Sequence, residues 1–346
     1  MMNILVTGGA GFIGSHFVKH YLSRHPADRV TTLDKLTYAG HKENLGEAMR
    51  SPRHRFVKGD VRNSGALRRL LPGVDAVVHF AAETHVDRSI LSADDFIQTN
   101  VQGTFTLANA ARAAGVRRFV HVSTDEVYGS VARGRTPESH LLNPSSPYAA
   151  SKAASDHMAL SLWHTFAHPV MVTRCTNNFG PFQYPEKFLP LFITNALEDR
   201  PLPLYGRGTN VRNWIHVLDH CEAVELVLRR GRAGETYNIA GDREWRNVDV
   251  AGRILKYLGK PRALLQFVKD RPGHDLRYAP DDRKIRRELG WRIRRPFGRE
   301  LPALIEWYRA NEDWWKPLKA AAFKDYYKKQ YAGRLRGESG GTAETS

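Results

Sequence analysis

Short runs of apolar and β-branched residues alternate with longer stretches of helical periodicity through the first two thirds of the chain. The short runs predict buried strands near residues 3–7, 29–34, 54–58, 75–80, 117–123, 169–174 and 235–240. Helical patterns lie between most of them, most clearly at residues 12–24, 93–114, 146–167 and 217–230. Strands that alternate with helices in this way predict an α/β fold, with a doubly wound parallel sheet covered by helices on both faces.

The pattern loosens after about residue 175, where proline, glycine and aromatic residues become frequent in NNFGPFQYPEKFLPLF and RPLPLYGRG. We expect a sheet domain over residues 1–174, which also receives residues from about 217 to 240. A smaller C-terminal substrate-binding lobe, interleaved with the sheet domain, is expected mainly over residues 175–330. The last stretch, GRLRGESGGTAETS (333–346), is small, polar and glycine-rich and predicts a disordered tail.

The composition of the 346 residues is that of an ordinary globular protein, with 42% hydrophobic and 25% charged residues. No apolar run approaches transmembrane length, and the chain opens MMNILVTGG, already a strand that enters a glycine turn. We therefore expect no signal peptide and no membrane partner. Cys175 and Cys221 form no CxxC motif, so neither a disulfide framework nor a structural zinc site is indicated, and a reducing cytoplasm fits.

The net charge of +16 is concentrated in RKIRRELGWRIRRPFGR (283–299), with a smaller cluster at 229–232. A strongly basic protein can bind nucleic acid or another anionic surface. No recognised nucleic-acid motif accompanies the charge here, so we expect a solvated basic face and no specific nucleic-acid partner. The same field would attract a small phosphorylated substrate.

GGAGFIG (8–14) follows a predicted strand and opens a predicted helix, and it fits both GxxGxxG and GxGxxG. Glycine permits the tight turn and lets backbone amides approach a pyrophosphate at the positive end of the helix. Asp34 ends the next strand, where a carboxylate would bind a ribose diol and repel a 2′-phosphate. Lys35 slightly softens this preference for NAD over NADP, and Asp60, after the third strand, is placed to meet the adenine. These features predict an NAD-binding domain of the Rossmann type.

PSSPYAASKAASDH (144–157) offers serines for an N-cap, Pro147 for a first helical turn, and Tyr148 and Lys152 on one helix face. A nearby ammonium favours the phenolate, so we expect the tyrosine pKa to fall from about 10 toward working pH. Such a base can take a proton from an alcohol while its hydride leaves for nicotinamide. Tyr38 and Lys42 have the same spacing, but they lie in a glycine-bearing loop where no helix is predicted.

STDEVYG (123–129) places two carboxylic acids, Asp125 and Glu126, at the end of a predicted buried strand. Buried carboxylates are costly, and neighbouring like charges push their pKa values apart. A solvated loop would explain such a pair taken alone. Beside a dinucleotide fold and a Tyr–Lys pair, however, the two acids indicate acid/base chemistry with one charged and one neutral member.

With these motifs the chain resembles the extended short-chain dehydrogenase/reductases and, within them, the dTDP-glucose 4,6-dehydratases. The resemblance runs from residue 2 to about 330. Its matching blocks are TGGAGFIGSH, LDKLTYAG, HFAAETHVDRSI, NVQGT, STDEVYGS, PSSPYAASKAASDH, NNFGP, PEKFLPLF, LPLYGRG, NVRNWIHVLDH, GETYNIAG and DRPGHDLRYA. The Asp–Glu pair is the most specific feature. Related epimerases carry small residues there, and GDP-mannose dehydratases and UDP-glucuronate decarboxylases usually carry a serine then a glutamate.

The resemblance implies a hydro-lyase that converts dTDP-glucose to dTDP-4-keto-6-deoxyglucose with NAD. Tyr148, supported by Lys152 and Thr124, would deprotonate the hydroxyl at carbon 4 while hydride passes to NAD. Glu126 would then remove the hydrogen on carbon 5, and protonated Asp125 would protonate the carbon 6 hydroxyl, which leaves as water. The stored hydride would return to carbon 6, and carbon 5 would be reprotonated. The catalytic residues implied are Thr124, Asp125, Glu126, Tyr148 and Lys152.

The resemblance also implies two sets of binding residues and a homodimer. The cofactor-binding residues are Gly8, Gly11, Phe12, Ile13, Gly14, Asp34, Lys35, Thr37, Gly40, Asp60, Val61, Ala81, Ala82, Thr99, Tyr148, Lys152 and Asn178. The substrate-binding residues are His85, Ser89, Thr124, Asn177, Lys187, Phe188, Leu189, Pro203, Tyr205, Arg212, Asn247, Arg271 and His274. Lys187, Arg212 and Arg271 are cations suited to a diphosphate, and Tyr205 would stack on the base. The homodimer would pair the apolar helices near 93–114 and 146–167 across a two-fold axis.

Other interpretations of the sequence remain. HVLDH places His216 and His220 one helical turn apart, but the glutamate of HExxH and a third ligand are missing, so we expect no metal site. An epimerase or decarboxylase on the same fold is the nearest enzymatic alternative, and the acid pair argues against it. A non-catalytic NAD-sensing protein tends to lose the tyrosine or lysine of the YxxxK motif, and this chain keeps both.

Overall fold

The computed structural model describes residues 1–320, and the chain divides into two compact units. The first unit comprises Met1–Phe182, Val211–Trp245 and Gly273–Leu301, and the second comprises Gln183–Asn210, Arg246–Pro272 and the chain from Pro302 on. This division differs from the expected one, in which the smaller lobe covers most of 175–330. Residues 175–182, 211–216, 241–245 and 273–301 belong to the first unit. The predicted tail at 333–346 lies outside the described residues.

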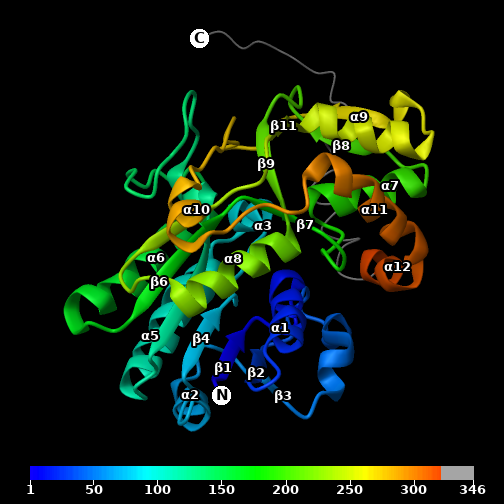
Figure 1. Ribbon diagram of the computed structural model, residues 1–346. Helices are drawn as coiled ribbons and strands as arrows, with labels where there is room; N and C mark the ends of the chain where they lie inside the picture. The colour runs from blue at the N-terminus through cyan, green and yellow to red at the C-terminus, as the bar shows by residue number, and fades with distance from the viewer. Residues whose placement is uncertain (321–346) are drawn as a thin grey trace. The chain divides into compact units, whose positions relative to one another are not determined.

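The first unit is built on a seven-stranded parallel sheet with the strand order β10-β6-β5-β4-β1-β2-β3 (Figure 1). Its strands are β1 (Asn3–Thr7), β2 (Arg29–Asp34), β3 (His54–Lys58), β4 (Ala76–His79), β5 (Arg118–Thr124), β6 (Val170–Cys175) and β10 (Thr236–Ile239). All seven predicted strands are thereby confirmed, as is the doubly wound Rossmann-type topology. The order reverses beside β1, and ligands of such sheets bind at the carboxyl ends of the strands near this switch point.

Alternate residues of the strands supply two apolar layers, because successive side chains point to opposite faces of a sheet. Ile4 and Val6 of β1 face the layer covered by α1 (Phe12–Arg24) and α8 (Val217–Arg230). Leu5, between them, faces the opposite layer. That layer is covered by α2 (Ser64–Leu70), α5 (Thr104–Ala113) and α6 (Pro147–Phe166). The predicted helices at 12–24, 146–167 and 217–230 are confirmed to within a residue.

The predicted helix at 93–114 consists of three parts. These are α4 (Asp94–Phe96), the π-helical segment η2 (Ile97–Gly103) and α5. Within η2 the buried Asn100 accepts from the Glu83 N–H at 2.8 Å and donates to the Ser151 hydroxyl at 2.9 Å. A widened turn that aims a polar side chain inward is typical of π-bulges at functional sites. Two further short helices, η1 (Lys42–Arg50) and α3 (Val86–Leu91), were not predicted.

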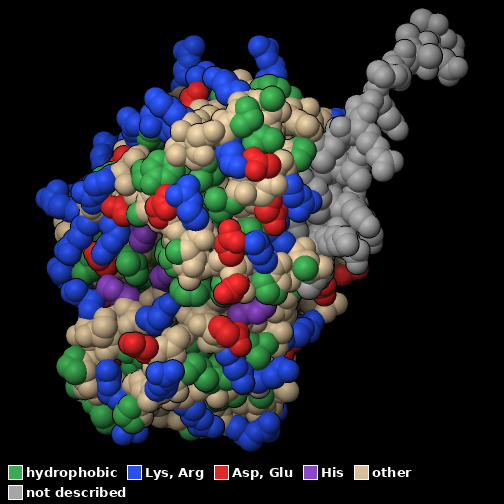
Figure 2. All heavy atoms as spheres, turned by 90° about the vertical axis from the view of Figure 1, so that its right-hand side faces the viewer, with side chains coloured by type: hydrophobic (Ala, Val, Ile, Leu, Met, Phe, Trp, Pro, Cys, Tyr) green, Lys and Arg blue, Asp and Glu red, His purple; other side chains and the backbone are tan. Residues whose placement is uncertain are grey.

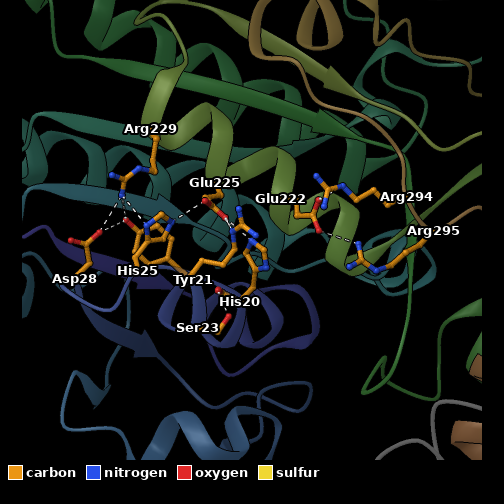
Figure 3. Close-up of polar contacts among 11 residues, drawn as sticks. His20, Tyr21, Ser23, His25, Asp28, Glu222, Glu225, Arg229, Arg294 and Arg295 are labelled. Carbon is orange, nitrogen blue, oxygen red and sulfur yellow. Dashed lines mark hydrogen bonds and ion pairs between the residues drawn. The ribbon is translucent and has the colours of Figure 1, made fainter.

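Helices α1 and α8 are joined by charged and polar contacts at their outer ends (Figure 3). Glu225 of α8 accepts from Nε2 of His20 at 2.6 Å and from Nε2 of His25 at 2.8 Å. Next to it, Arg229 donates to Tyr21 and to Asp28, at 3.0 and 3.2 Å. These contacts fix the C-terminal end of α1 to α8, away from the glycine-rich turn at residues 8–14 that precedes α1.

A second, three-stranded sheet in the order β11-β9-β7 is the reason that the first unit extends beyond residue 174. It contains β7 (Asn177–Phe179), β9 (Val211–His216) and β11 (Glu244–Arg246), and α10 (Arg283–Leu289) lies in the same unit. The second unit has β8 (Leu202–Tyr205) paired in parallel with β12 (Leu265–Val268). Its helices are α7 (Phe188–Leu197), α9 (Asn247–Leu258), η4 (Arg262–Leu264), most of α11 (Phe297–Ala310) and α12 (Glu312–Ala320).

The basic block at 283–299 is largely paired with acids. Arg283 pairs with Asp281 and Arg286 with Asp282, while Arg295 contacts both Asp219 and Glu222. Figure 2 shows Lys and Arg side chains interspersed with Asp and Glu over the face that it presents. Mixed signs of charge are typical of a solvated surface. No helix within residues 1–320 has both the length and the apolar character needed to cross a membrane.

Candidate active site

The glycine turn between β1 and α1 has room for glycine alone. Gly8 has φ +69°, and a Cβ there would lie 2.6 Å from the backbone nitrogen of Ala81. A Cβ on Gly14 would lie 2.2 Å from the Gly8 carbonyl oxygen. The N-cap of α1 is Gly11, which offers no side-chain acceptor to the first amides of the helix. Such amides, at the positive end of the helix dipole, suit a pyrophosphate.

Asp34 ends β2 beside this turn. Its Oδ2 accepts from the Ala10 N–H at 2.9 Å, and its Oδ1 accepts from the Leu36 N–H at 2.8 Å. Burial raises the pKa of Asp34, which these two hydrogen bonds oppose. The carboxylate is therefore held at the position where the sequence predicts a contact to the adenosine ribose.

Lys35 points to another acid. Its Nζ lies 3.1 Å from Oδ2 of Asp60, which also accepts from Arg62. Although burial opposes it, these contacts lower the pKa of Asp60 to about 2. The charge of Lys35 is thus balanced by Asp60, which reduces its expected attraction for a 2′-phosphate.

The other predicted cofactor residues gather at the carboxyl ends of the same strands. They follow β2, β3 and β4 or lie in α1 and η2, and they are Phe12, Ile13, Thr37, Gly40, Val61, Ala81, Ala82 and Thr99. A Cβ on Gly40 would lie 2.9 Å from Oδ1 of Asp34, so the loop after β2 closes tightly on that carboxylate. The glycine cradle, the carboxylate and the open helix end together fit NAD.

Tyr148 and Lys152 lie on the buried face of α6. Ser146 caps this helix by accepting from the Ala149 N–H at 3.2 Å, and Pro147 occupies the first turn, as the sequence predicts. The hydroxyl of Ser89 accepts from the Tyr148 N–H at 3.1 Å. Lys152 donates to the Val122 carbonyl at 2.9 Å. The helix start and the end of β5 thus fix both side chains.

The expected lowering of the Tyr148 pKa is wrong. Burial raises the pKa of Tyr148 well above its ordinary value, and the charge of Glu126 raises it further. A hydrogen bond from the Thr124 hydroxyl acts in the opposite direction. Burial also lowers the pKa of Lys152 to about 8. Desolvation, which the sequence does not reveal, is the largest cause of the raised pKa of Tyr148.

The acid pair forms the first turn of the short helix η3 (Asp125–Tyr128) directly after β5. Thr124 caps this turn, because its hydroxyl accepts from the Glu126 N–H at 3.2 Å. Asp125 is 2% exposed, and its Oδ2 has no hydrogen-bond partner among the described residues. Burial and the adjacent Glu126 raise the pKa of Asp125 well above its ordinary value, whereas Glu126 is only half-buried. The raised pKa favours the neutral form that the sequence analysis expects for Asp125.

Tyr278 is a site residue that the sequence analysis missed. Its hydroxyl donates to Oδ2 of Asp275 at 2.7 Å and lies 3.4 Å from Oε2 of Glu126. Arg212 lies over the Tyr278 ring, 4.3 Å from its centroid, and its charge opposes the raised pKa of Asp125. Tyr278 belongs to the matching block DRPGHDLRYA. It lies 152 residues from Glu126 along the chain, so the sequence does not reveal their contact.

The two asparagines of β7 differ in their surroundings. Oδ1 of Asn178 accepts from Nδ1–H of His220 at 2.9 Å, and its Nδ2 donates to the Thr176 carbonyl at 3.0 Å. Oδ1 of Asn177 is buried and has no hydrogen-bond partner within residues 1–320. An orphaned buried oxygen is typical of a site that awaits a ligand.

The histidines of HVLDH have structural contacts. His216 caps α8 by accepting from the Leu218 N–H at 3.2 Å, and His220 holds Asn178. Over the described part of the chain, no group of three His, Cys, Asp or Glu side chains is arranged to hold a metal ion.

The remaining predicted substrate residues are divided between the units. In the first unit, His85 caps α3, Ser89 lies in the same helix, and His274 lies before Asp275. In the second unit, Lys187 precedes α7, and Phe188 and Leu189 form its first turn. Pro203 and Tyr205 lie in β8, Arg271 follows β12, and Asn247 begins α9. Because β8 and β12 are parallel, Tyr205 at the end of β8 and Arg271 after β12 both lie toward the carboxyl ends of these two strands.

The chain is similar to several known proteins over most of its length. The family model described as GDP-mannose 4,6 dehydratase matches residues 5–301. A dTDP-glucose 4,6-dehydratase of Streptomyces niveus is 51% identical over 323 residues, covering 92% of this chain and 96% of the relative. The corresponding protein of Salmonella typhimurium is 44% identical over 361 residues, covering 96% of this chain and 100% of the relative.

A similar solved structure is the crystal structure of DesIV, a dTDP-glucose 4,6-dehydratase from Streptomyces venezuelae, with NAD and TYD bound. It has a TM-score of 0.91 and 55% identity, covering 92% of this chain and 100% of that chain. This chain therefore belongs to the family of nucleotide-sugar dehydratases. The particular members that it resembles at about half identity are the dTDP-glucose 4,6-dehydratases, as the sequence motifs predict.

Proposed function

We propose that this chain dehydrates dTDP-glucose to dTDP-4-keto-6-deoxyglucose with NAD as a cofactor that is regenerated in each cycle. The observation that carries the proposal is the buried Asp125, whose pKa burial raises, beside the half-buried Glu126 and next to the Tyr148–Lys152 pair. An elimination needs one acid to donate a proton and one base to accept one. The choice of the dTDP sugar follows from the relatives.

NAD is held by the glycine turn, with Asp34 at its ribose and Asp60 near its adenine. When bound, it accepts hydride from the sugar and later returns it. Tyr148 takes the proton of the carbon 4 hydroxyl, and Thr124 donates a hydrogen bond that favours the phenolate. Lys152 supports the same charge from the next turn of α6.

Glu126 removes the proton from carbon 5, which the new carbon 4 ketone has made acidic. Asp125 donates its proton to the carbon 6 hydroxyl, which leaves as water. Burial favours the protonated form of Asp125 until this step, while the less buried Glu126 keeps more of the hydration that favours a carboxylate. The Tyr278 hydroxyl lies 3.4 Å from Oε2 of Glu126, and turning its proton from Asp275 to this oxygen would steady the charged form of Glu126. After the hydride has returned to carbon 6, carbon 5 takes a proton back from Glu126.

We assign the substrate to the remaining predicted residues. Asn177 binds the sugar through its orphaned oxygen, and Lys187 and Arg271 bind the diphosphate. By the resemblance, Arg212 of the first unit takes the same role, with the guanidinium hydrogens that remain after its contacts to the carbonyls of Val211, Leu276 and Asp275. Tyr205 stacks on the base.

We also assign the protein to the cytoplasm, where its two buried, unbridged cysteines stay reduced, and to a two-fold homodimer. Exposed apolar side chains on α3, η2 and α5 support the dimer: Leu91 is 63%, Ile97 55% and Phe105 39% exposed. Light scattering that gave a monomer mass at micromolar concentration would contradict this interface.

The function is tested by incubating the purified protein separately with dTDP-glucose, UDP-glucose and GDP-mannose and weighing each product. We expect dTDP-glucose to give a product lighter by one water, without added cofactor. An epimerase would leave the mass unchanged. If dTDP-glucose did not lose water while another nucleotide sugar reacted, the proposed substrate would be wrong and the chain would have the activity of a different member of the family.

A further inference from the structure

The buried face of α6 carries a third charged residue. Tyr148, Lys152 and Asp156 follow one another at four-residue spacing, so their side chains line one face of the helix. All three are at most 8% exposed, and Asp156 is completely buried. The YxxxK motif explains the first two residues and leaves the third without a role.

Asp156 is fixed by partners from two strands. Its Oδ2 accepts from Nε of Arg174 at 2.8 Å, and its Oδ1 lies 3.3 Å from Nε2 of His121. Arg174 also donates to the Tyr128 hydroxyl at 2.9 Å, which connects this ion pair to the strand-end motif that contains Asp125 and Glu126. A buried carboxylate held in this way stays charged, and the pKa of Asp156 is well below its ordinary value because of Arg174 and His121, although burial opposes this.

Lys152 faces groups from three strands as well as its own helix. Burial lowers the pKa of His121 of β5 to about 4 and that of His79 of β4 well below its ordinary value, so both are neutral at pH 7. Burial raises the pKa of Cys175 of β6 to about 12, so it is a neutral thiol.

On α6 itself, Tyr148 and Asp156 lie one turn to either side of Lys152. The charges of Asp125 and Glu126 of η3 raise the pKa of Tyr148, but neither acid is among the main causes of the shifted pKa of Lys152. Among the groups that face the ammonium, Asp156 is therefore the one that carries a negative charge at neutral pH.

We propose that Asp156 is a positioning residue that keeps Lys152 positively charged beside Tyr148. This inference rests on the proposed function, because the role given to Lys152 is to support the Tyr148 phenolate during the proposed dehydration. Lys152 is buried, and desolvation favours its neutral form. The charge of Asp156 opposes that tendency, so that Lys152 retains its proton when Tyr148 must become a phenolate.

The test compares Asp156→Asn with Arg174→Lys, two variants that disturb the same buried ion pair. Both should lose thermal stability. Asp156→Asn removes the anion that Lys152 needs, so the alkaline limb of kcat/KM for dTDP-glucose should move down by about one to three pH units. Arg174→Lys keeps a cation beside Asp156, so the carboxylate stays charged and the alkaline limb should not move down. Equal shifts in the two variants would show a merely structural role and overturn the proposal.

A second readout does not depend on activity. In Asp156→Asn a protonated Lys152 is buried without an anion, so the loss of melting temperature relative to wild type should be largest at pH 6. The loss should shrink as pH rises and Lys152 releases its proton, because the lowered pKa belongs to the folded state. For Arg174→Lys, which keeps both charges of the pair, we expect no such shrinkage. A wild type without dehydratase activity would refute the proposed function, and this melting comparison would still decide the role of Asp156.

Discussion

The Tyr278 hydroxyl lies 3.4 Å from Oε2 of Glu126 while it donates to Oδ2 of Asp275 at 2.7 Å. Asp275 also accepts from the Ser145 hydroxyl, just before α6. Three segments that are distant in the sequence, η3, the start of α6 and the chain before α10, therefore meet at the proposed base. The contact fixes the carboxylate on which the elimination step depends.

Tyr278→Phe removes the hydroxyl and keeps the ring under Arg212. A hydrogen bond to a charged group contributes about 1.5–3 kcal/mol, so we expect kcat to fall about ten- to a hundredfold with little change in KM. Steady-state kinetics on dTDP-glucose measure this. An unchanged kcat would remove Tyr278 from the account.

Much of the site could be predicted from the sequence because its parts are local. The glycine turn, the Tyr–Lys spacing and the Asp–Glu pair each occupy a few consecutive residues, and β-branched runs locate the strands that carry them. The Tyr278–Glu126 contact could not be predicted, since it joins distant segments through the folded chain. The three-residue strands β7 and β11 were missed because they are too short to show a periodic pattern. The direction of the Tyr148 pKa depends on burial, which only the structure reveals.

The two acids should fail at different steps when each is replaced. Glu126→Gln keeps the shape of the side chain but cannot accept the carbon 5 proton, so oxidation at carbon 4 should proceed and carbon 5 exchange with deuterated water should vanish. Asp125→Asn should still exchange at carbon 5 but lose water about a hundred- to ten-thousandfold more slowly. NMR of the recovered sugar distinguishes these outcomes. Near-normal turnover by Glu126→Gln would contradict the assignment, and Tyr148→Phe, which should block both processes, is the control.

Gly14→Ala should empty the enzyme of cofactor. Its new Cβ would lie 2.2 Å from the Gly8 carbonyl oxygen, so the turn that receives the pyrophosphate must shift. We expect little or no NAD in the extract of the denatured, purified variant. Gly252→Ala is the matched control. Gly252 lies in α9, and a Cβ there would meet no neighbouring residue within 4 Å. Equal NAD content in the two variants would argue against the turn as the cofactor site.

Glu225 should make stability depend on acid pH. Although burial opposes it, hydrogen bonds from His20 and His25 lower its pKa to about 2 from 4.5. A carboxylate whose folded pKa is lowered contributes stability above its unfolded pKa and loses it as pH falls through the folded one. The melting temperature of Glu225→Gln should thus be well below wild type at pH 6, with the difference closing between about pH 4.5 and 2. If the melting-temperature difference between Glu225→Gln and wild type did not change with pH, the contacts of Glu225 with His20 and His25 in Figure 3 would not be its cause.

The most direct measurement of the proposed chemistry is the mass of the product that the wild-type enzyme forms from dTDP-glucose in deuterated water. If Glu126 exchanges the carbon 5 proton and Asp125 expels the carbon 6 hydroxyl, the product loses one water and gains one deuterium at carbon 5. No NADH should accumulate in proportion to product. A product that has lost water but carries no solvent deuterium at carbon 5, or one of unchanged mass, would contradict the account.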